Sequence, residues 1–471
     1  MKNFNEILEL DALGQKELLD QKQISPVELS EFYISRIEKF NPKLNAVIYT
    51  MFDEALDKVK NKTYSDGPLA GMPFLIKDLN SIKGHPTTNG SKLMKDYIAN
   101  ESEPLIQRYE NAGLIFLGKT NTPEFGFLPT TEPELFGPTN NPWDLERSPG
   151  GSSGGAAAAV AAGLIPFAHA SDGGGSIRIP STACGLFGFK PSRGMMPYSP
   201  YVNHLSINHA VTRSVRDSAF LLDVTKGGAP TDNYPTADRG QSFFQALKEK
   251  PRKLKIAYTA DFNGQVALDD VTRKAFEHSV EVVKSLGHEV VEVSPQFNHE
   301  FFANSFIKAW VATGAIVIKH LAMLVGKEIN RENLDPLSLS VYEEGKKLTA
   351  EQYEEARVFL QMEGQKLLAF HREYDVLLTP VLSKEPVKTG SIQTAEAYEF
   401  LDNFVNYVSF TPIANATGQP AMSVPLYWTE NDIPIGAHFT GRIGDDATLF
   451  QLAYQLEQEN PWIHQYKKIQ L

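Results

Sequence analysis

Two short glycine-serine segments, at residues 150–155 and 173–176, constrain the fold more than any other part of the chain. They read GGSSGG and GGGS, and an alanine-rich stretch joins them. Because glycine lacks a Cβ atom, a backbone built from it can take positive φ and can turn its N–H groups outward. Such turns suit a serine that is held close to a reacting carbonyl group.

The spacing of the two segments predicts that their serines meet in space. Ser152 and Ser176 are 24 residues apart (176 − 152 = 24). This length is enough for a helix of about a dozen residues beginning at Ala156, a turn near Gly163 and a short strand over 164–169. Such a unit returns the chain to the edge from which it started.

The chain as a whole is expected to form one large α/β/α domain. Segments typical of helices and of strands alternate almost to the C-terminus, and 34 glycines and 29 prolines are spread along the chain. Strands joined through helices imply a largely parallel or mixed central sheet, covered by helices on both faces. Within residues 1–471 we distinguish a helical N-terminal segment (about 1–60), a core with the glycine-serine turns (about 67–225) and a C-terminal α/β part (about 250–471).

Composition excludes several classes of protein. The net charge is −12, from 45 basic and 57 acidic residues, and no basic patch stands out, which argues against nucleic-acid binding. The lone cysteine, Cys184, excludes an internal disulfide and is expected to be a small buried apolar residue. No apolar run has the length of a membrane span, and residues 1–14 lack the apolar core of a signal peptide, so we expect a cytoplasmic protein without a membrane anchor.

Outside the two turns, polar residues stand at positions where a structural role is the simpler interpretation. An apolar strand over 72–76 ends at Lys77, which local residues alone would assign to a solvated strand end. Asp172 and Arg178 flank the second turn and are expected to form an ion pair that braces it. His169 is expected to be a core or hydrogen-bonded histidine. The histidines show no metal-ligand spacing, so no metal site is expected.

The first glycine-serine segment admits two other interpretations. It matches the G-x-S-x-G nucleophile elbow, with Ser152 as nucleophile and His438 or His464 as base, but residues 143–149 make a poor preceding strand. The second interpretation is a phosphate-binding loop, because the segment precedes a predicted helix and a helix N-terminus attracts anions. No lysine follows the glycines as a P-loop requires, and the G-x-G-x-x-G pattern is absent.

Taken together, these residues resemble the amidase signature family of hydrolases. The likeness rests on ordered blocks at matching spacing and runs through nearly the whole chain. The blocks are GMPFLIKD at 71–78, SPGGSSGG at 148–155, DGGGSIRIP at 172–180 with its continuation through 184–185 and 188–191, NATGQP at 415–420 and PIG at 434–436.

The resemblance implies a Ser-Ser-Lys triad and no cofactor. By position, Ser176 matches the nucleophile, Ser152 the bridging serine that follows a cis peptide bond, and Lys77 the base. A serine hydroxyl needs a base in contact, and a lysine can serve only when burial lowers its pKa and leaves it neutral. The resemblance also implies an oxyanion hole, formed by the N–H groups of Gly173, Gly174, Gly175 and Ser176. It further implies four supporting residues: Ser153, Ser171, Asp172 and Arg178.

Two departures from the common family pattern point to a subgroup. Gly173 stands where many members have a larger residue, and residues 168–170 read Ala-His-Ala. Both features resemble the subgroup that contains the aminohexanoate cyclic-dimer hydrolases. We hypothesise that the small Gly173 widens the pocket floor for bulky or cyclic amides. Specificity is expected to lie in the loop 198–209 and in segments 300–345 and 390–410, which include predicted helices over 301–324 and 395–408.

The expected function is therefore cleavage of linear amide C–N bonds in small molecules through an acyl-enzyme. A homodimer is expected for an enzyme of this size. One alternative is the glutaminase-type subunit of a tRNA-dependent amidotransferase, which would need a partner enzyme. Another is a catalytically inactive binding or scaffold protein, although such a protein would have no need of Lys77, Ser152 and Ser176 together.

Overall fold

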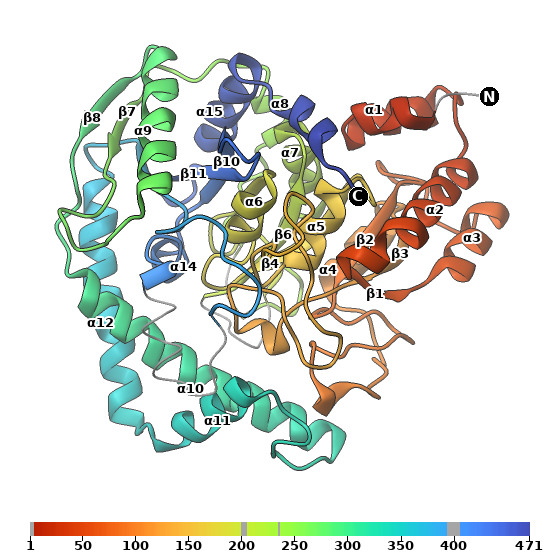
Figure 1. The fold of residues 1–471 in the computed structure, drawn as a ribbon, viewed down its shortest axis with the longest axis horizontal. Coiled ribbons are helices and arrows are strands. Elements are labelled where there is room, and N and C mark those ends of the chain that lie inside the picture. The colour runs from red at the N-terminus through yellow and green to blue at the C-terminus, as the bar shows by residue number, and fades with distance from the viewer. Residues whose placement is uncertain (1–3, 199–204, 234–235, 393–405) are drawn as a thin grey trace.

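One sheet of eleven strands organises the molecule in the computed structural model, which describes residues 4–198, 205–233, 236–392 and 406–471 (Figure 1). The strands are β1 Val47–Thr50, β2 Pro73–Lys77, β3 Ile115–Thr120, β4 Phe167–Asp172, β5 Phe187–Lys190, β6 Ile207–Thr212, β7 Lys255–Tyr258, β8 Glu289–Glu292, β9 Val376–Pro380, β10 Ala421–Trp428 and β11 Pro434–Thr440.

Helices flank this sheet and cross its ends (Figure 1). The α-helices are α1 Ala12–Asp20, α2 Pro26–Leu44, α3 Phe52–Asn61, α4 Pro104–Asn111, α5 Gly154–Ala161, α6 Arg178–Cys184, α7 Val215–Thr225, α8 Phe243–Ala246, α9 Asp270–Ser285, α10 His299–Val325, α11 Pro336–Lys347, α12 Ala350–Phe370, α14 Pro412–Thr417 and α15 Asp446–Glu459. Short 3-10 helices are η1 Phe4–Glu9, η2 Lys92–Met94, η3 Glu124–Gly126 and η4 Ile463–Lys468.

The sheet is mixed, with the strand order β1-β3-β2-β4-β6-β5-β10-β11-β9-β7-β8. β2 runs parallel to β3 and β4, whereas β4 pairs with β6, and β5 with β10, in antiparallel fashion. The prediction of one α/β domain with a mixed sheet is confirmed, and the largely parallel alternative is wrong. Two strands that were not predicted, β5 and β6, join the N-terminal and C-terminal halves of the sheet.

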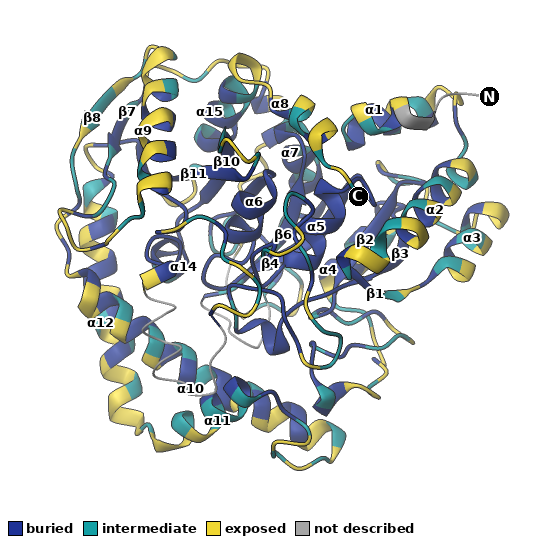
Figure 2. Cartoon of the chain, in the orientation of Figure 1, coloured by how far each residue is buried: buried dark blue, intermediate teal, exposed yellow. Residues whose placement is uncertain are grey.

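The centre of the sheet is buried on both faces, which explains why its strands are almost continuously apolar. Every residue of β2, β3 and β4 is buried, as is every residue of α5. In Figure 2, α5 and the strands labelled β2 and β4 are dark blue, the colour of buried residues. Small residues let α5 lie very close to the end of β3, because a Cβ atom on Gly155 would stand only 2.5 Å from the backbone nitrogen of Asn121.

Three expectations for the elements need correction. α5 ends at Ala161 and is shorter than predicted, and the following strand lies at 167–172 rather than 164–169. The expected loop at 198–209 partly becomes strand β6. The predicted helix at 395–408 lies mostly outside the described residues.

α10 is the one helix in the described segments that is long and apolar enough to span a membrane. Its most apolar 18-residue window has a mean hydropathy of 1.5, yet 56% of that window is buried within the protein. Its inner face packs against α11 and α12 and carries Phe306 and Trp310 toward the second glycine-serine turn. Burial of this kind is typical of a core helix.

We expect Gly155→Ala to lower the free energy of unfolding by about 1 to 3 kcal/mol, because the added methyl group would overlap the backbone that follows β3. The matched control is Gly364→Ala in α12, where the new Cβ atom would lie 3.4 Å from Thr417 Cγ2, an ordinary contact. That change should stabilise by up to about 1 kcal/mol, since alanine favours a helix over glycine. Urea unfolding measures both, and equal effects would contradict the close approach.

Candidate active site

Lys77 is the centre of a buried polar cluster at the end of β2. Its side chain is fully buried, so the solvated strand-end interpretation is wrong. Its Nζ atom lies 2.7 Å from Oγ of Ser152, 2.9 Å from Oγ of Ser153 and 3.1 Å from Oγ of Ser171. The lysine thus contacts three serine hydroxyls from two different segments of the chain.

Burial lowers the pKa of Lys77 from 10.5 to about 7, and the charge of Asp172 only partly opposes this effect. Two acidic residues close to the lysine already have other partners. Asp78, the next residue in sequence, forms a buried ion pair of 2.6 Å with Lys119, and Asp172 pairs with Arg178. A lysine without a carboxylate of its own loses its proton readily in such surroundings, and the neutral nitrogen has a lone pair that can accept one.

The two glycine-serine turns meet beside this lysine. The peptide bond between Gly151 and Ser152 is cis, as the resemblance implies. The N–H of Ser153 donates to the carbonyl oxygen of Ser176 at 3.3 Å, which joins the two turns through the backbone. The Oγ atom of Ser153 also accepts from the N–H of Ser171 at 3.3 Å. Ser153 and Ser171 therefore hold Lys77 and connect its strand to the loop that carries Ser176.

The second turn is packed tightly against α10. A Cβ atom on Gly173 would lie 3.2 Å from Cζ3 of Trp310, and one on Gly174 would lie 3.4 Å from Cζ of Phe306. The space above Gly173 is thus filled by the Trp310 ring. The hypothesis that a small Gly173 widens the pocket needs this correction, because the indole ring takes the volume that a larger side chain would occupy.

The expected set of oxyanion-hole donors also needs a correction. The N–H of Gly175 donates to Oδ1 of Asp172 at 2.8 Å, so it is already engaged. In the described part of the chain, the N–H groups of Gly173, Gly174 and Ser176 donate to no acceptor. These three remain as candidate donors to a bound oxyanion.

Asp172 and Arg178 form the buried ion pair that the sequence predicts. Nη2 and Nε of Arg178 lie 2.8 Å and 3.0 Å from the two oxygens of Asp172. Burial alone would raise the pKa of Asp172, but the Arg178 guanidinium holds it well below its ordinary value. The carboxylate therefore stays ionised and keeps accepting from the N–H of Gly175, which fixes the turn.

Residues from the far end of the chain complete this network, and no local pattern indicated their role. Asn415 donates through Nδ2 to Oδ1 of Asp172 at 2.9 Å, and the carbonyl oxygen of Thr411 accepts from Arg178 at 2.9 Å. His438 Nε2 lies 2.9 Å from Nη1 of Arg178, and burial lowers its pKa well below the ordinary value. A neutral histidine that accepts from Arg178 is not a base for Ser152. The other candidate base, His464, is exposed in η4, whereas Ser152 is buried, so the geometry does not support the nucleophile-elbow interpretation.

His169 has a structural role, as predicted. Its Nδ1 atom accepts from the backbone N–H of Lys77 at 3.3 Å, and its Nε2 atom lies 3.2 Å from Oδ1 of Asn208. Burial lowers its pKa to about 3, so the ring is neutral at physiological pH. The histidine ties β2 to β6 across β4 and positions the backbone of Lys77. Cys184 is buried and free, also as predicted.

A small cavity opens beside Ser176. Its lining is Gly126, Phe127, Leu128, Pro129, Gly174, Ser176, Ile179 and Trp310. A Cβ atom on Gly126 would lie 3.2 Å from Oγ of Ser152, so this lining residue also lies next to Ser152. The segment 300–345 contributes Trp310, whereas parts of 198–209 and 390–410 lie outside the described residues. Phe127 was missed, since an apolar residue in a loop carries no signal of a pocket.

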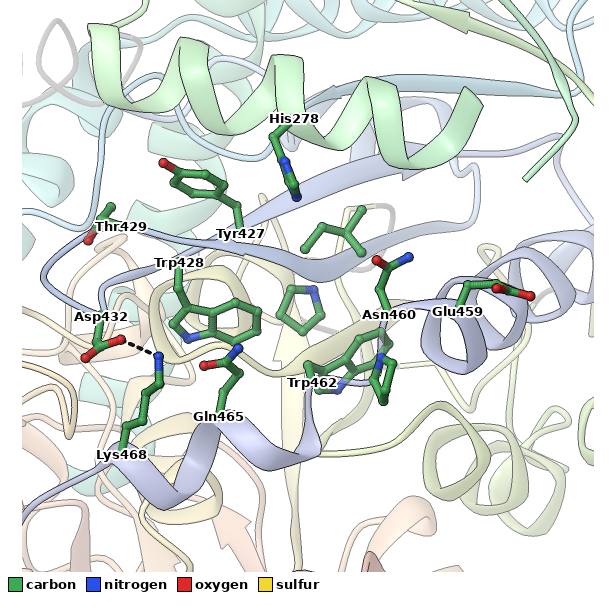
Figure 3. Close-up of a pocket in the computed structure, with 13 residues that line it drawn as sticks. His278, Tyr427, Trp428, Thr429, Asp432, Glu459, Asn460, Trp462, Gln465 and Lys468 are labelled. Carbon is green, nitrogen blue, oxygen red and sulfur yellow. Dashed lines mark hydrogen bonds and ion pairs between the residues drawn. The ribbon is translucent and has the colours of Figure 1, made fainter. Parts of the chain in front are cut away.

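A larger cavity of about 580 Å³ lies elsewhere, between the end of β10, α9 and the C-terminal residues (Figure 3). None of the predicted site residues lines it, and its one lysine, Lys468, forms an ion pair of 2.7 Å with Asp432. Nothing there resembles the serine-lysine cluster. In the described ranges, no group of His, Cys, Asp and Glu side chains is placed to hold a metal ion.

We expect Lys77→Met to be more stable than the wild type near pH 6, and the difference to shrink toward pH 10. The pKa of Lys77 is about 7 in the folded chain against 10.5 ordinarily, so between these values the unfolded chain binds more protons. The unfolding free energy of the wild type therefore rises with pH in that range, whereas that of the variant lacks this contribution. Urea unfolding at several pH values measures the difference. Lys60→Met, at an exposed lysine, should show no such trend, and a gap that widens with pH would contradict the burial of an uncharged lysine.

Comparison with known proteins agrees with this geometry. The chain is 34% identical over 480 residues to 6-aminohexanoate-cyclic-dimer hydrolase of Paenarthrobacter ureafaciens, covering 96% of this chain and 95% of the relative. It is 32% identical over 466 residues to an acylamidase of Rhodococcus erythropolis, covering 96% of each. A solved structure of 6-aminohexanoate cyclic dimer hydrolase superposes with a TM-score of 0.90 at 33% identity, covering 97% of this chain and 98% of that one.

The names of these relatives favour neither the amidotransferase subunit nor the inactive scaffold. The model of the family described as Amidase matches residues 28–450, which is most of the chain. The serine-lysine cluster and the two glycine-serine turns lie within that match. The chain belongs to the amidase signature family of amidohydrolases.

Proposed function

We propose that this protein hydrolyses linear amide C–N bonds of small molecules, with Ser176 as nucleophile, Ser152 as bridging serine and Lys77 as base. One observation carries the proposal. The Nζ atom of Lys77, whose pKa burial lowers to about 7, lies 2.7 Å from Oγ of Ser152. A neutral amine at this distance can accept the hydroxyl proton directly.

The proton relay follows from this contact. Neutral Lys77 takes the proton of Ser152, and Ser152 takes that of Ser176, whose Oγ atom forms a bond to the amide carbon. The carbonyl oxygen becomes an oxyanion. When it collapses, the C–N bond breaks and Ser152 returns a proton to the departing amine. Water then attacks the ester on Ser176 by the same relay, which releases the acid and restores the free serine.

The oxyanion is stabilised by backbone N–H groups of the second turn. The N–H groups of Gly173, Gly174 and Ser176 supply the donors, because Asp172 already engages that of Gly175. Losing one such donor typically costs about 2.7 to 4 kcal/mol of transition-state stabilisation. Asp172 and Arg178 act as positioning residues that keep the turn in shape. Ser153 and Ser171 position Lys77 through their hydroxyls.

Three further proposals come from the sequence. The substrate is a small-molecule amide, hydrolysed without a cofactor. The protein acts in the cytoplasm, where the lone buried thiol of Cys184 suits reducing conditions. The active protein is a homodimer.

We expect Ser176→Ala, Ser152→Ala and Lys77→Ala each to reduce kcat by about a thousandfold or more on a panel of amides, because the three groups act as one unit. Combining two of the changes should reduce activity little further. A fluorophosphonate probe should label Ser176 in the wild type and should not label Ser176→Ala. Unchanged rates in the three variants would remove the assignment.

Two controls separate this function from its alternatives. Glutamine is assayed for ammonia release with and without candidate partner proteins. Partner-dependent release would support an amidotransferase subunit. Absence of any serine adduct and of any amide turnover would support a scaffold.

We expect kcat/KM on an uncharged anilide to rise with pH and level off above an apparent pKa near 7, because Lys77 must be neutral to act as base. The matched control is Lys190→Met. Burial also lowers the pKa of Lys190 to about 7, but its Nζ atom donates to the carbonyl oxygen of Pro191 at 2.8 Å and not to a serine. This variant should keep the midpoint. If the midpoint of the pH profile shifts in Lys190→Met, the titrating group is Lys190 and not Lys77, which would contradict the prediction.

A further inference from the structure

We propose that Trp310 sets the size limit for the acyl group of the substrate, and that this enzyme prefers amides of short, uncharged acids. The proposal rests on the proposed function, because it assigns the cavity beside Ser176 to the part of the substrate that stays bound as the acyl-enzyme. It replaces the expectation of a pocket widened at Gly173.

An aromatic pair on α10 covers the second glycine-serine turn. Phe306 and Trp310 are four residues apart, so they lie on one face of the helix, and their rings stack with centroids 5.9 Å apart and an interplanar angle of 19°. Their ring edges lie over Gly174 and Gly173 respectively. The rings of Phe306 and Trp310 therefore cover the turn that carries Ser176 on the side that faces α10.

The opposite wall comes from the segment after η3. Phe127 meets Trp310 edge to face, with ring centroids 6.1 Å apart. Phe127 and Ile179 are buried, so they close the cavity on the core side. A space that is closed on the core side suits the acyl group, because the amine has to leave before water attacks the ester.

Among the described residues, the lining of the cavity offers no partner for a charged group. The side chains that line it beside Ser176 are those of phenylalanine, leucine, proline, isoleucine and tryptophan, and the other two lining residues are glycines. A carboxylate or ammonium group placed there would lose its water without gaining an ion pair or a hydrogen-bonding side chain other than the serine itself. A substrate whose acyl group carries a charge is therefore disfavoured.

Gly173 and Trp310 share one volume. The φ angle of Gly173 is not in the left-handed region, unlike that of Gly175, so the backbone at 173 would accept any residue. An added Cβ atom would lie 3.2 Å from Cζ3 and 3.3 Å from Cη2 of Trp310, whereas the next atom, Cβ of Ser206, would be at 3.9 Å, an ordinary contact. The site therefore has room for a large side chain at position 173 or at position 310, but not at both.

The first test compares anilides of acetic, butyric, hexanoic and benzoic acid, which share one leaving amine. Trp310→Ala should raise kcat/KM for the hexanoyl relative to the acetyl substrate by about tenfold or more, since a single methylene in a pocket changes specificity by about 10- to 200-fold. Trp310→Leu should give a smaller shift in the same direction and guards against a folding defect. Ile316→Ala, at an exposed site on the same helix, is the control and should leave the ratio unchanged.

A second series tests charge. The wild type should hydrolyse the pentanoyl anilide at least about a hundredfold better than the glutaryl anilide, which adds a carboxylate at the end of the chain. A series that varies the amine at constant acyl group should respond little to Trp310→Ala. A response confined to the amine series would overturn the assignment of the cavity to the acyl group.

The third test exchanges the two volumes. Gly173→Val should reduce activity at least about tenfold in the wild type, because the new side chain meets the indole ring. In the Trp310→Ala background the same change should be tolerated and should restore the preference for short acyl groups. Independent effects of the two changes would refute the shared volume.

The two proposals fail in different ways. If the wild type hydrolyses the anilides and Ser176→Ala does not, but the acyl preference is the same in all Trp310 variants, only the role of Trp310 is refuted. If the wild type hydrolyses no amide, the proposed function is refuted and this inference falls with it.

Discussion

The protonation state of one buried lysine, Lys77, decides whether the polar cluster at the end of β2 contains a group that can accept a proton. Lys77 has a lowered pKa because it is buried, and the charge of Asp172 opposes this effect only in part. Asp78 is held by Lys119, and Asp172 by Arg178. A free carboxylate within reach would keep the lysine charged and would leave no base for the serines. The two ion pairs thus leave Lys77 without a carboxylate of its own.

The sequence allowed the serine-lysine cluster to be predicted, but not its surroundings. The glycines around Ser152 and Ser176 leave a local pattern, whereas Lys77 was assigned to the cluster only through the family resemblance, because local residues alone indicated a solvated strand end. Trp310 and Phe127 leave none, since an apolar side chain that lines a cavity looks like one that fills the core. The engagement of the Gly175 N–H depends on the direction of a carboxylate oxygen, and no spacing along the chain specifies a direction.

The fold was predictable where helices and strands are long and locally periodic. The helix expected over 301–324 and the strand expected over 72–76 lie close to the observed bounds of α10 and β2. β5 has only four residues, two of them phenylalanine beside a glycine, and its pairing with β10 joins segments more than 200 residues apart. Such strands are stabilised by distant partners rather than by local preference, so local patterns do not reveal them.

The ion pair of Asp172 and Arg178 has a consequence for how the protein is made. Its hydrogen-bonding partners Thr411, Asn415 and His438 follow Arg178 by 233, 237 and 260 residues. A ribosome will have synthesised most of the polypeptide before these groups emerge, and until then a buried guanidinium would lack part of its shell. The loop that carries Ser176 therefore cannot acquire its full set of partners until the segment through His438 has been synthesised. Contacts between such distant segments also form slowly, so newly made molecules pass through a period in which chaperones can engage them.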